Sequence, residues 1–266
     1  MNITAKLSAV LLAAASVGML SAEDIFVQSE PADFAPAKRI VKAEDSFSVK
    51  GLALILSAKS FTLDPAKKYQ ISGEFCQKGG KQVALYLGFA PYDAKGRQIF
   101  SNMVNIVKDT QTEVAADAKK GDKVVKVKDA SKWNVKTPYS HIVFGAKADF
   151  SDLPNFSRQA TAQPNAQQQG EVWEIQLKKP LVQDVAAGTA VRQHTDGSAF
   201  IYTGGYKKLT DQWVTMKGTI SGISSFGLPS NKMWKGTEKV RVLILLSGCD
   251  RTSEVSFRNI KVTEVK

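Results

Sequence analysis

Apolar and polar residues alternate one by one along much of this chain, and no segment spaces its apolar residues as an amphipathic helix would. In residues 83–89 every second side chain is apolar, and Tyr86 lies on the other face. Residues 69–75 and 213–220 alternate in the same way. Successive side chains of a strand point to opposite faces, so this pattern predicts half-buried β-strands.

Other segments complete a β-rich fold. Residues 239–247 are apolar on both faces, as in a central strand, and a further strand is expected to return over residues 98–107. In residues 255–262 the apolar positions change parity near Arg258-Asn259, which predicts a β-bulge. Short strands separated by Gly, Asp and Pro turns favour an all-β fold, an antiparallel jelly-roll β-sandwich.

The middle of the chain forms a separate unit in this interpretation. It contains a polar, low-complexity stretch at residues 163–170 that is typical of a loop. Residues 23–115 and 210–266 are expected to make one discontinuous sandwich, and residues 116–209 a small β subdomain inserted into one of its loops. The short strands expected in the insert are 123–128, 141–146, 172–177 and 200–203.

The first 22 residues have the pattern of a secretory signal peptide. Lys6 precedes an uncharged run from Leu7 to Leu20, which is too short to span a bilayer comfortably, and Ser21-Ala22 precede two acidic residues. We expect cleavage after Ala22 and an exported protein, whether periplasmic, on the cell surface or secreted. An uncleaved anchor is the alternative. No later apolar run reaches the length of a membrane span, so no integral membrane segment is expected.

Basic residues outnumber acidic ones, 36 to 25, and the formal net charge is +11. The excess is spread evenly between the insert and the rest, with no basic block beyond paired lysines. Proteins that bind nucleic acid usually concentrate their charge on one face, so no nucleic-acid partner is expected. A dispersed positive field suits an acidic glycan or an anionic envelope, and a merely solvated basic surface is the alternative.

Cysteine and histidine are scarce, with two of each in the chain. Neither a disulfide-rich scaffold nor a structural zinc cluster is therefore expected. Cys76 and Cys249 each follow a predicted strand, and alternating strand directions place both strand ends at the same pole of the sandwich. In an exported protein these two thiols are candidates for a disulfide, and two free thiols are the alternative left open.

Five segments outside the insert combine strand alternation with turns in a recognisable order. They are residues 61–73, 92–96, 211–215, 240–244 and 255–262. This succession resembles the galactose-binding-like carbohydrate-binding modules of the cellulose- and xylan-binding type, over residues 45–112 and 210–266. The resemblance implies a polysaccharide ligand and partner enzymes of glycan degradation. The last strand of such modules often carries two Asp residues, whereas this chain has Arg258-Asn259. A structural calcium ion is therefore unsupported although left open, and no other cofactor is expected.

Catalytic patterns are few. No GxSxG, HExxH or P-loop pattern occurs, and Asp149 and Asp152 are interpreted as turn residues rather than as the paired carboxylates of a hydrolase. His194 has basic and acidic neighbours and is a candidate base of a glycan lyase or hydrolase, although a loop histidine is more often only hydrogen-bonded. An enzyme is therefore the least favoured reading.

Sugar binding requires less, because the apolar face of a sugar ring stacks on an aromatic side chain. Tyr69 and Trp173 share faces with apolar residues and are assigned to cores. The remaining aromatic candidates for a carbohydrate surface are Tyr86, Trp133, Tyr139, Tyr202, Tyr206, Trp213 and Trp234. We expect a non-catalytic protein that binds a polysaccharide, more favourably an anionic one. The alternative is a structural or adhesive envelope protein that contacts other proteins through its edges.

Overall fold

The structure, a computed structural model, describes residues 23–265 and consists almost entirely of strands and loops. Strands hold 47% of the described residues, and no helix among them reaches seven residues, which confirms the predicted all-β class. The short 3-10 turns are η1 (Pro31–Asp33), η2 (Ala37–Arg39) and η3 (Ser101–Met103). Within residues 23–265 no helix has the length and apolarity needed to cross a membrane. The predicted signal peptide, residues 1–22, lies outside the described residues.

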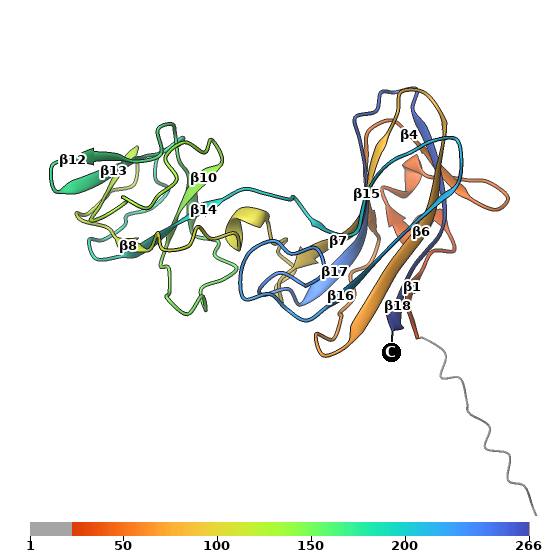
Figure 1. Cartoon of the computed structure of the whole chain (residues 1–266), viewed down its shortest axis with the longest axis horizontal. Helices are drawn as coiled ribbons and strands as arrows, with labels where there is room; N and C mark the ends of the chain where they lie inside the picture. The colour runs from red at the N-terminus through yellow and green to blue at the C-terminus, as the bar shows by residue number, and fades with distance from the viewer. Residues whose placement is uncertain (1–22, 266) are drawn as a thin grey trace, which may run out of the picture.

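Two antiparallel sheets form the larger part of the molecule (Figure 1). The six-stranded sheet runs in the order β16-β6-β18-β4-β3, and β1 pairs with β18. Its strands are β1 (Asp24–Val27), β3 (Val41–Lys42), β4 (Phe47–Lys50), β6 (Lys68–Gly79), β16 (Val214–Ser221) and β18 (Glu254–Val265). The five-stranded sheet runs in the order β15-β7-β17-β5-β2. Its strands are β2 (Phe34–Ala35), β5 (Ala53–Ser57), β7 (Ala84–Tyr92), β15 (Ile201–Lys208) and β17 (Lys239–Ser247).

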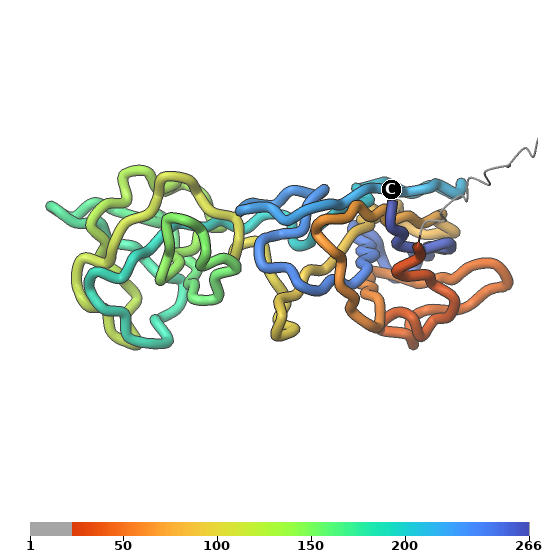
Figure 2. Tube along the Cα trace, turned by 90° about the horizontal axis from the view of Figure 1, so that it is seen from below, coloured from red at the N-terminus to blue at the C-terminus, as the bar shows by residue number. Residues whose placement is uncertain are grey.

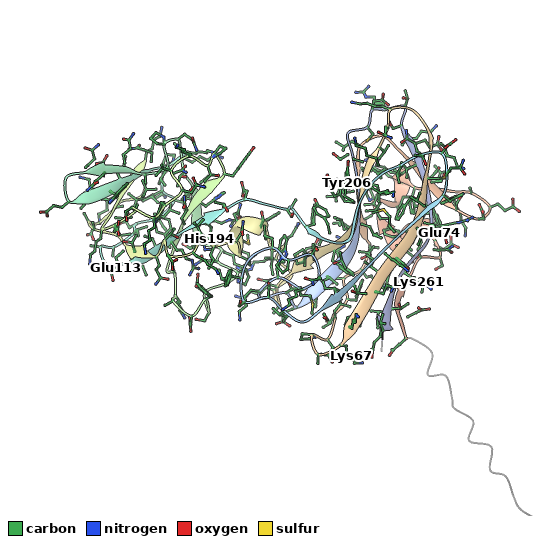
Figure 3. All side chains as sticks on the ribbon, in the orientation of Figure 1. Lys67, Glu74, Glu113, His194, Tyr206 and Lys261 are labelled. Atoms are coloured by element: carbon green, nitrogen blue, oxygen red, sulfur yellow. The ribbon has the colours of Figure 1, made fainter. Side chains whose placement is uncertain are left out.

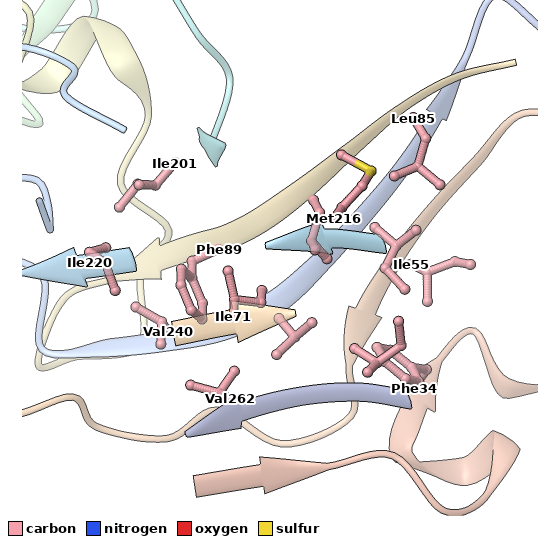
Figure 4. Close-up of a cluster of buried hydrophobic side chains, with 14 of the residues drawn as sticks. Phe34, Ile55, Ile71, Leu85, Phe89, Ile201, Met216, Ile220, Val240 and Val262 are labelled. Atoms are coloured by element: carbon pink, nitrogen blue, oxygen red, sulfur yellow. The ribbon is translucent and has the colours of Figure 1, made fainter. Parts of the chain in front are cut away.

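The alternation read in the sequence decides which side chains these sheets bury. On β6, Tyr69, Ile71 and Phe75 are buried, and on β7 Leu85 and Phe89 are buried in the same hydrophobic cluster. Side chains of both sheets meet in this cluster (Figure 4). The two sheets therefore enclose one core, as in a β-sandwich.

The bulge expected in the last strand is present. The pairing of β18 with β6 shifts between Arg258 and Lys261, and Asn259 takes a left-handed conformation with φ 54°. This extra residue lets both Phe257 and Ile260 point into the core in spite of their opposite parity.

A second, smaller β unit lies at the other end of an elongated molecule (Figure 2). It contains a four-stranded sheet in the order β11-β10-β14-β8 and a three-stranded sheet in the order β12-β13-β9. These strands are β8 (Thr112–Glu113), β9 (Val124–Val127), β10 (Ser140–Phe144), β11 (Arg158–Ala160), β12 (Gln167–Gln169), β13 (Val172–Gln176) and β14 (Ala190–Thr195). Its own hydrophobic cluster includes Val125, Ile142, Ile175 and Val191.

Several local expectations need correction. Residues 200–209 were assigned to the insert, yet β15 pairs with β7 in the five-stranded sheet, and β8 belongs to the small unit although it precedes residue 116. The strand expected over residues 98–107 is replaced by η3 between two single bridges, Tyr92 to Gln98 and Ile106 to His194. The polar stretch at 163–170 contributes β12, which pairs with β13. The partners of β15 and β8 are distant in the sequence, and local alternation does not reveal them. β12 pairs with the neighbouring β13, but its three residues are all glutamine and show no alternation.

Cys76 and Cys249 are both free thiols, which is the alternative that the sequence left open beside a disulfide. Cys76 follows the inward-facing Phe75 on β6 and therefore points to the outer face of the six-stranded sheet, where it is buried. Cys249 packs against the core between the sheets. The two strand ends can lie at the same end of the sandwich, but the two side chains occupy different faces of it.

Candidate functional site

Three of the predicted aromatic residues come together on the outer face of the five-stranded sheet. Tyr86 of β7 lies directly opposite Tyr206 of β15, and Tyr202 reaches the same place from the start of β15. The ring centroids of Tyr86 and Tyr202 are 4.7 Å apart, and those of Tyr86 and Tyr206 are 4.9 Å apart. We call these three residues the tyrosine cluster.

The strands explain why the cluster is on the surface. On β7, Leu85 and Leu87 are buried in the core, so Tyr86 between them points outward. Its ring is half-buried by its neighbours, and Tyr206 keeps 49% of its surface exposed (Figure 3). The cluster therefore offers tilted aromatic faces to solvent at a fixed position on a rigid sheet.

The hydroxyl group of Tyr202 stays protonated at neutral pH. Burial raises the pKa of Tyr202 above its usual value, and the neighbouring Tyr86 raises it further. A protonated phenol both donates and accepts hydrogen bonds. The cluster therefore combines aromatic ring faces with hydroxyl groups that can bond to a ligand. A positive charge is also near, because the exposed Lys208 lies two residues beyond Tyr206 on β15.

An apolar row continues from the cluster across the same sheet. Leu245 of β17 pairs with Tyr86 on one side and with Leu54 of β5 on the other. Leu245 is partly exposed and Leu54 is 41% exposed. The outer face of this sheet is therefore aromatic at the β15 edge and aliphatic towards β5.

Two of the predicted surface aromatics are buried, so the prediction for them is wrong. Trp234 has no exposed surface and belongs to the core of the sandwich. Trp133 is 4% exposed, belongs to the cluster of the small unit, and its indole N–H donates to the carbonyl oxygen of Thr110 at 2.9 Å. Both lie in loops that fold inward over a core, and neither can stack on a sugar.

The other two candidates are on the surface but apart from the tyrosine cluster. Trp213 precedes β16 in the six-stranded sheet, and the Arg258 guanidinium lies 4.3 Å from its ring centroid. The ammonium of Lys78 is 5.5 Å from the same ring, so cations already occupy its surroundings. Tyr139 is 62% exposed in the loop before β10 of the small unit. The structure therefore makes one surface of three residues from the seven candidates.

His194 does not reach solvent. It is fully buried on β14, its Nε2 accepts a hydrogen bond from Arg192 Nε at 3.1 Å, and its Nδ1 lies 2.8 Å from the carbonyl oxygen of Asn102. Burial is the main cause that lowers the pKa of His194 to about 4. The imidazole is neutral and both of its nitrogens are engaged, so it is not placed to act as a base on a substrate (Figure 3).

The two carboxylates near this network also have structural partners. Asp152 forms an ion pair with Arg192 at 2.8 Å and accepts a hydrogen bond from the Asn155 amide at 3.0 Å. Asp149 accepts the backbone N–H of Ser151, which is a turn interaction, and this bond lowers its pKa. Both residues lie in turns, as expected, and the buried ion pair of Asp152 with Arg192 is an additional role that the sequence did not indicate.

The last strand has a cation where a resembling module often has acidic residues. Arg258 donates to Glu74 and to Asp45, each at 2.8 Å, and the Asn259 amide donates to Glu74 at 3.1 Å. The hydrogen bond from Arg258 is the main cause that lowers the pKa of Glu74. Within residues 23–265, His, Cys, Asp and Glu side chains do not gather in a group of three that could hold a metal ion.

A cleft of about 560 Å³ lies where the sandwich meets the small unit, and the sequence alone gives no indication of it. Its walls include Phe150 from a loop of the small unit and Phe226 from the segment between β16 and β17. Lys108 and Gln111, on the connection between η3 and β8, stand at its rim. We call it the junction cleft. No local pattern predicts it, because its residues come from four separate segments of the chain.

No protein-family model matches this chain, and no curated protein matches it either.

Proposed function

We propose that this is an exported, non-catalytic protein that binds a polysaccharide, and that the tyrosine cluster is the platform on which sugar rings stack. The observation that carries the proposal is the convergence of Tyr86, Tyr202 and Tyr206 on one outer sheet face. The C–H face of a sugar ring stacks on an aromatic ring, and phenol hydroxyls bond to sugar hydroxyls. The resemblance to carbohydrate-binding modules and the pattern of residues 1–22 support the same proposal.

The charge of the chain favours an anionic polysaccharide. The formal net charge is +11, and Lys207 and Lys208 are exposed beside Tyr206. Stacking supplies the specific part of the affinity in this proposal. The electrostatic part weakens as salt shortens the distance over which charges interact, so binding to an acidic polysaccharide is expected to fall with ionic strength.

The test is affinity electrophoresis of the mature protein in gels that contain neutral, uronate-rich or sulfated polysaccharides. Tyr86→Ala and Tyr206→Ala are expected to weaken retardation by roughly 5- to 30-fold in affinity, because removal of a central aromatic contact costs about 1–2 kcal/mol. Tyr139→Ala is the matched control, since Tyr139 is an exposed tyrosine of the small unit. Retardation by no polysaccharide would overturn the proposal, and release of shortened chains would point to an enzyme.

The apolar row beside the cluster favours one second candidate, a structural or adhesive envelope protein. Exposed leucines in a row with tyrosines are suited to contact between proteins. Leu54→Lys separates the two candidates, because Leu54 lies two strands away from the tyrosine cluster. If the face joins copies of this chain, the substitution abolishes a concentration-dependent dimer in sedimentation. If the face binds glycan at the tyrosines, retardation by polysaccharide stays within about twofold of the wild type.

A further inference from the structure

The junction cleft is held in shape by hydrogen bonds on two sides. The Val107 N–H donates to the Gln193 carbonyl oxygen at 2.9 Å, and the Thr110 hydroxyl donates to the Val107 carbonyl oxygen at 2.6 Å. On the other side, the Gly227 N–H donates to the Val104 carbonyl oxygen at 2.8 Å. The first bond fixes the 107–110 turn to β14. The last bond fixes the segment that carries Phe226 to the connection between η3 and β8. A cavity whose walls are fixed in advance binds a ligand without an ordering cost.

Two of the walls are aromatic and meet at an angle. The rings of Phe150 and Phe226 have centroids 5.1 Å apart and an interplanar angle of 62°. Both residues are only partly buried. The buried Arg192 guanidinium lies 5.2 Å from the Phe150 ring centroid, and bonds to Lys147, Asp152 and His194 hold it there. The exposed Lys108 ammonium lies 5.3 Å from the Phe226 ring centroid, so a sugar ring that packs on Phe226 does so beside this cation. The aromatic corner is therefore fixed in place and partly reachable from solvent.

The backbone of this cleft is unusual in the molecule. Among residues 23–265, three residues other than glycine have a left-handed φ, and two of them, Asp109 and Phe150 at 60° each, line the cleft. A bulky residue such as phenylalanine rarely takes this conformation. Such strain persists where the surrounding structure imposes it, and it is concentrated at binding and active sites.

The charges of the cleft balance one another. Lys108 and Asp109 are adjacent and exposed at the rim, and Arg192 is paired with Asp152 behind the wall. Gln111 adds an exposed amide that both donates and accepts. The site therefore combines two aromatic rings with groups that bond to hydroxyls and carries no excess of either charge. Its volume lies within the range of small-ligand cavities.

We propose that the junction cleft is a second binding site and that it holds a neutral sugar unit, such as the end of a neutral oligosaccharide. The ring of that sugar packs against Phe226 and Phe150, and its hydroxyls bond to Asp109, Gln111 and Lys108. The inference rests on carbohydrate as the proposed class of ligand, but not on the tyrosine cluster. The two sites differ in ligand, because the cleft is electrically balanced whereas lysines flank the tyrosine cluster.

The experiment titrates the full mature protein with neutral disaccharides of glucose, galactose, mannose and xylose, followed by saturation-transfer NMR and calorimetry. At least one disaccharide is expected to bind, with little change when salt is raised from about 0.05 to 0.5 M. Phe226→Ala should weaken this binding about tenfold and Gln111→Ala several-fold, whereas Tyr206→Ala should leave it unchanged. Phe226 partly packs on the core, so Phe226→Ala could weaken binding by destabilising the fold. Gln111 is exposed, so Gln111→Ala tests the site without that risk.

The outcomes separate this inference from the proposed function. If no disaccharide binds, or if binding is lost in Tyr206→Ala and kept in Phe226→Ala, the cleft site is overturned. If the protein is still retarded by polysaccharide in affinity electrophoresis when the disaccharide results contradict the cleft site, the tyrosine cluster remains supported as a binding platform. Disaccharide binding that depends on Phe226, without polysaccharide retardation, supports the cleft and overturns the platform.

Discussion

At the scale of single residues, the buried hydrogen bonds of Arg192 fix the state of His194. The Arg192 Nε always carries a proton, so the His194 Nε2 that faces it at 3.1 Å must accept. The proton of the neutral ring is therefore on Nδ1, which donates to the Asn102 carbonyl oxygen at 2.8 Å. Protonation of Nε2 would place two donors face to face in a buried site. Burial and Arg192 thus both lower the pKa of this histidine, to about 4.

The first prediction is a loss of stability in mild acid. A histidine with a pKa of about 4 when folded and near 6.5 when unfolded binds its proton more readily in the unfolded chain. The free energy of unfolding therefore falls as pH falls from about 6.5 towards 4, by roughly 3 kcal/mol from this residue. Urea unfolding at several pH values measures it. The matched variant is His194→Gln, which should be less stable at pH 7 but lose less on acidification, and equal losses in both proteins would contradict the prediction.

The residues that the sequence assigned correctly are those whose face a strand determines. Tyr86 lies on a strand with clear alternation, so its outward direction could be predicted. Trp133 and Trp234 lie in loops, where no period indicates the direction of a side chain, and their large apolar surface is buried in the two cores. Phe150 and Phe226 have no local signal at all. Their role depends on a junction between segments distant in the sequence.

At the scale of elements, β15 determines whether the tyrosine cluster forms. It pairs with β7 at Ile201, loses register, and pairs again from Gly205 to Lys208. Across the intervening residues its backbone passes so close to Gly88 and Gly218 that a Cβ at either glycine would collide with it. Gly88 belongs to the five-stranded sheet and Gly218 to the six-stranded sheet. β15 therefore closes the edge between the two sheets, and the sequence alone did not predict this because the pairing is irregular.

The second prediction concerns Gly88. In Gly88→Ala the new methyl group would meet the Ile201 carbonyl oxygen and, at 2.9 Å, the Cα of Tyr202. We expect the free energy of unfolding to fall by about 1–3 kcal/mol, as for other overpacked sites, and retardation by polysaccharide to weaken because Tyr202 is displaced. Gly79→Ala on β6 is the matched control, since a Cβ there meets nothing within 4 Å. Chemical denaturation and affinity electrophoresis measure both effects, and a Gly88→Ala protein as stable as Gly79→Ala would refute the role given to β15.

At the scale of the whole molecule, the chain leaves the sandwich and returns to it through one antiparallel crossing. Ile106 bridges His194, and the Thr195 N–H donates to the Asn105 carbonyl oxygen at 3.0 Å. The small unit between these points has its own cluster, but Leu153 belongs to the core of the sandwich, and Phe150 and Phe156 pack on it. The two parts thus have distinct cores and are joined both by this crossing and by the loop that carries Phe150, Leu153 and Phe156. The junction cleft lies between these two connections. The sequence predicted the insertion, but its boundaries assigned β8 to the sandwich and β15 to the insert, whereas β8 pairs with β14 and β15 with β7.

The last prediction follows from that crossing. Replacing residues 107–193 with Asn-Gly would join the bridged Ile106 and His194 by a two-residue turn, which suits antiparallel partners. This shortened protein should unfold in one cooperative transition, with a free energy lower by about 2–5 kcal/mol because the buried Leu153 is lost. It should keep its retardation by polysaccharide and lose disaccharide binding, since Phe150 and Gln111 are removed while Tyr86, Tyr202 and Tyr206 remain.

Deleting residues 116–209 removes β15, together with the buried Ile201 and Leu209, and is expected to leave no cooperative transition. Circular dichroism during urea unfolding compares the two, and a molten 107–193 variant would show that the sandwich cannot fold without the small unit.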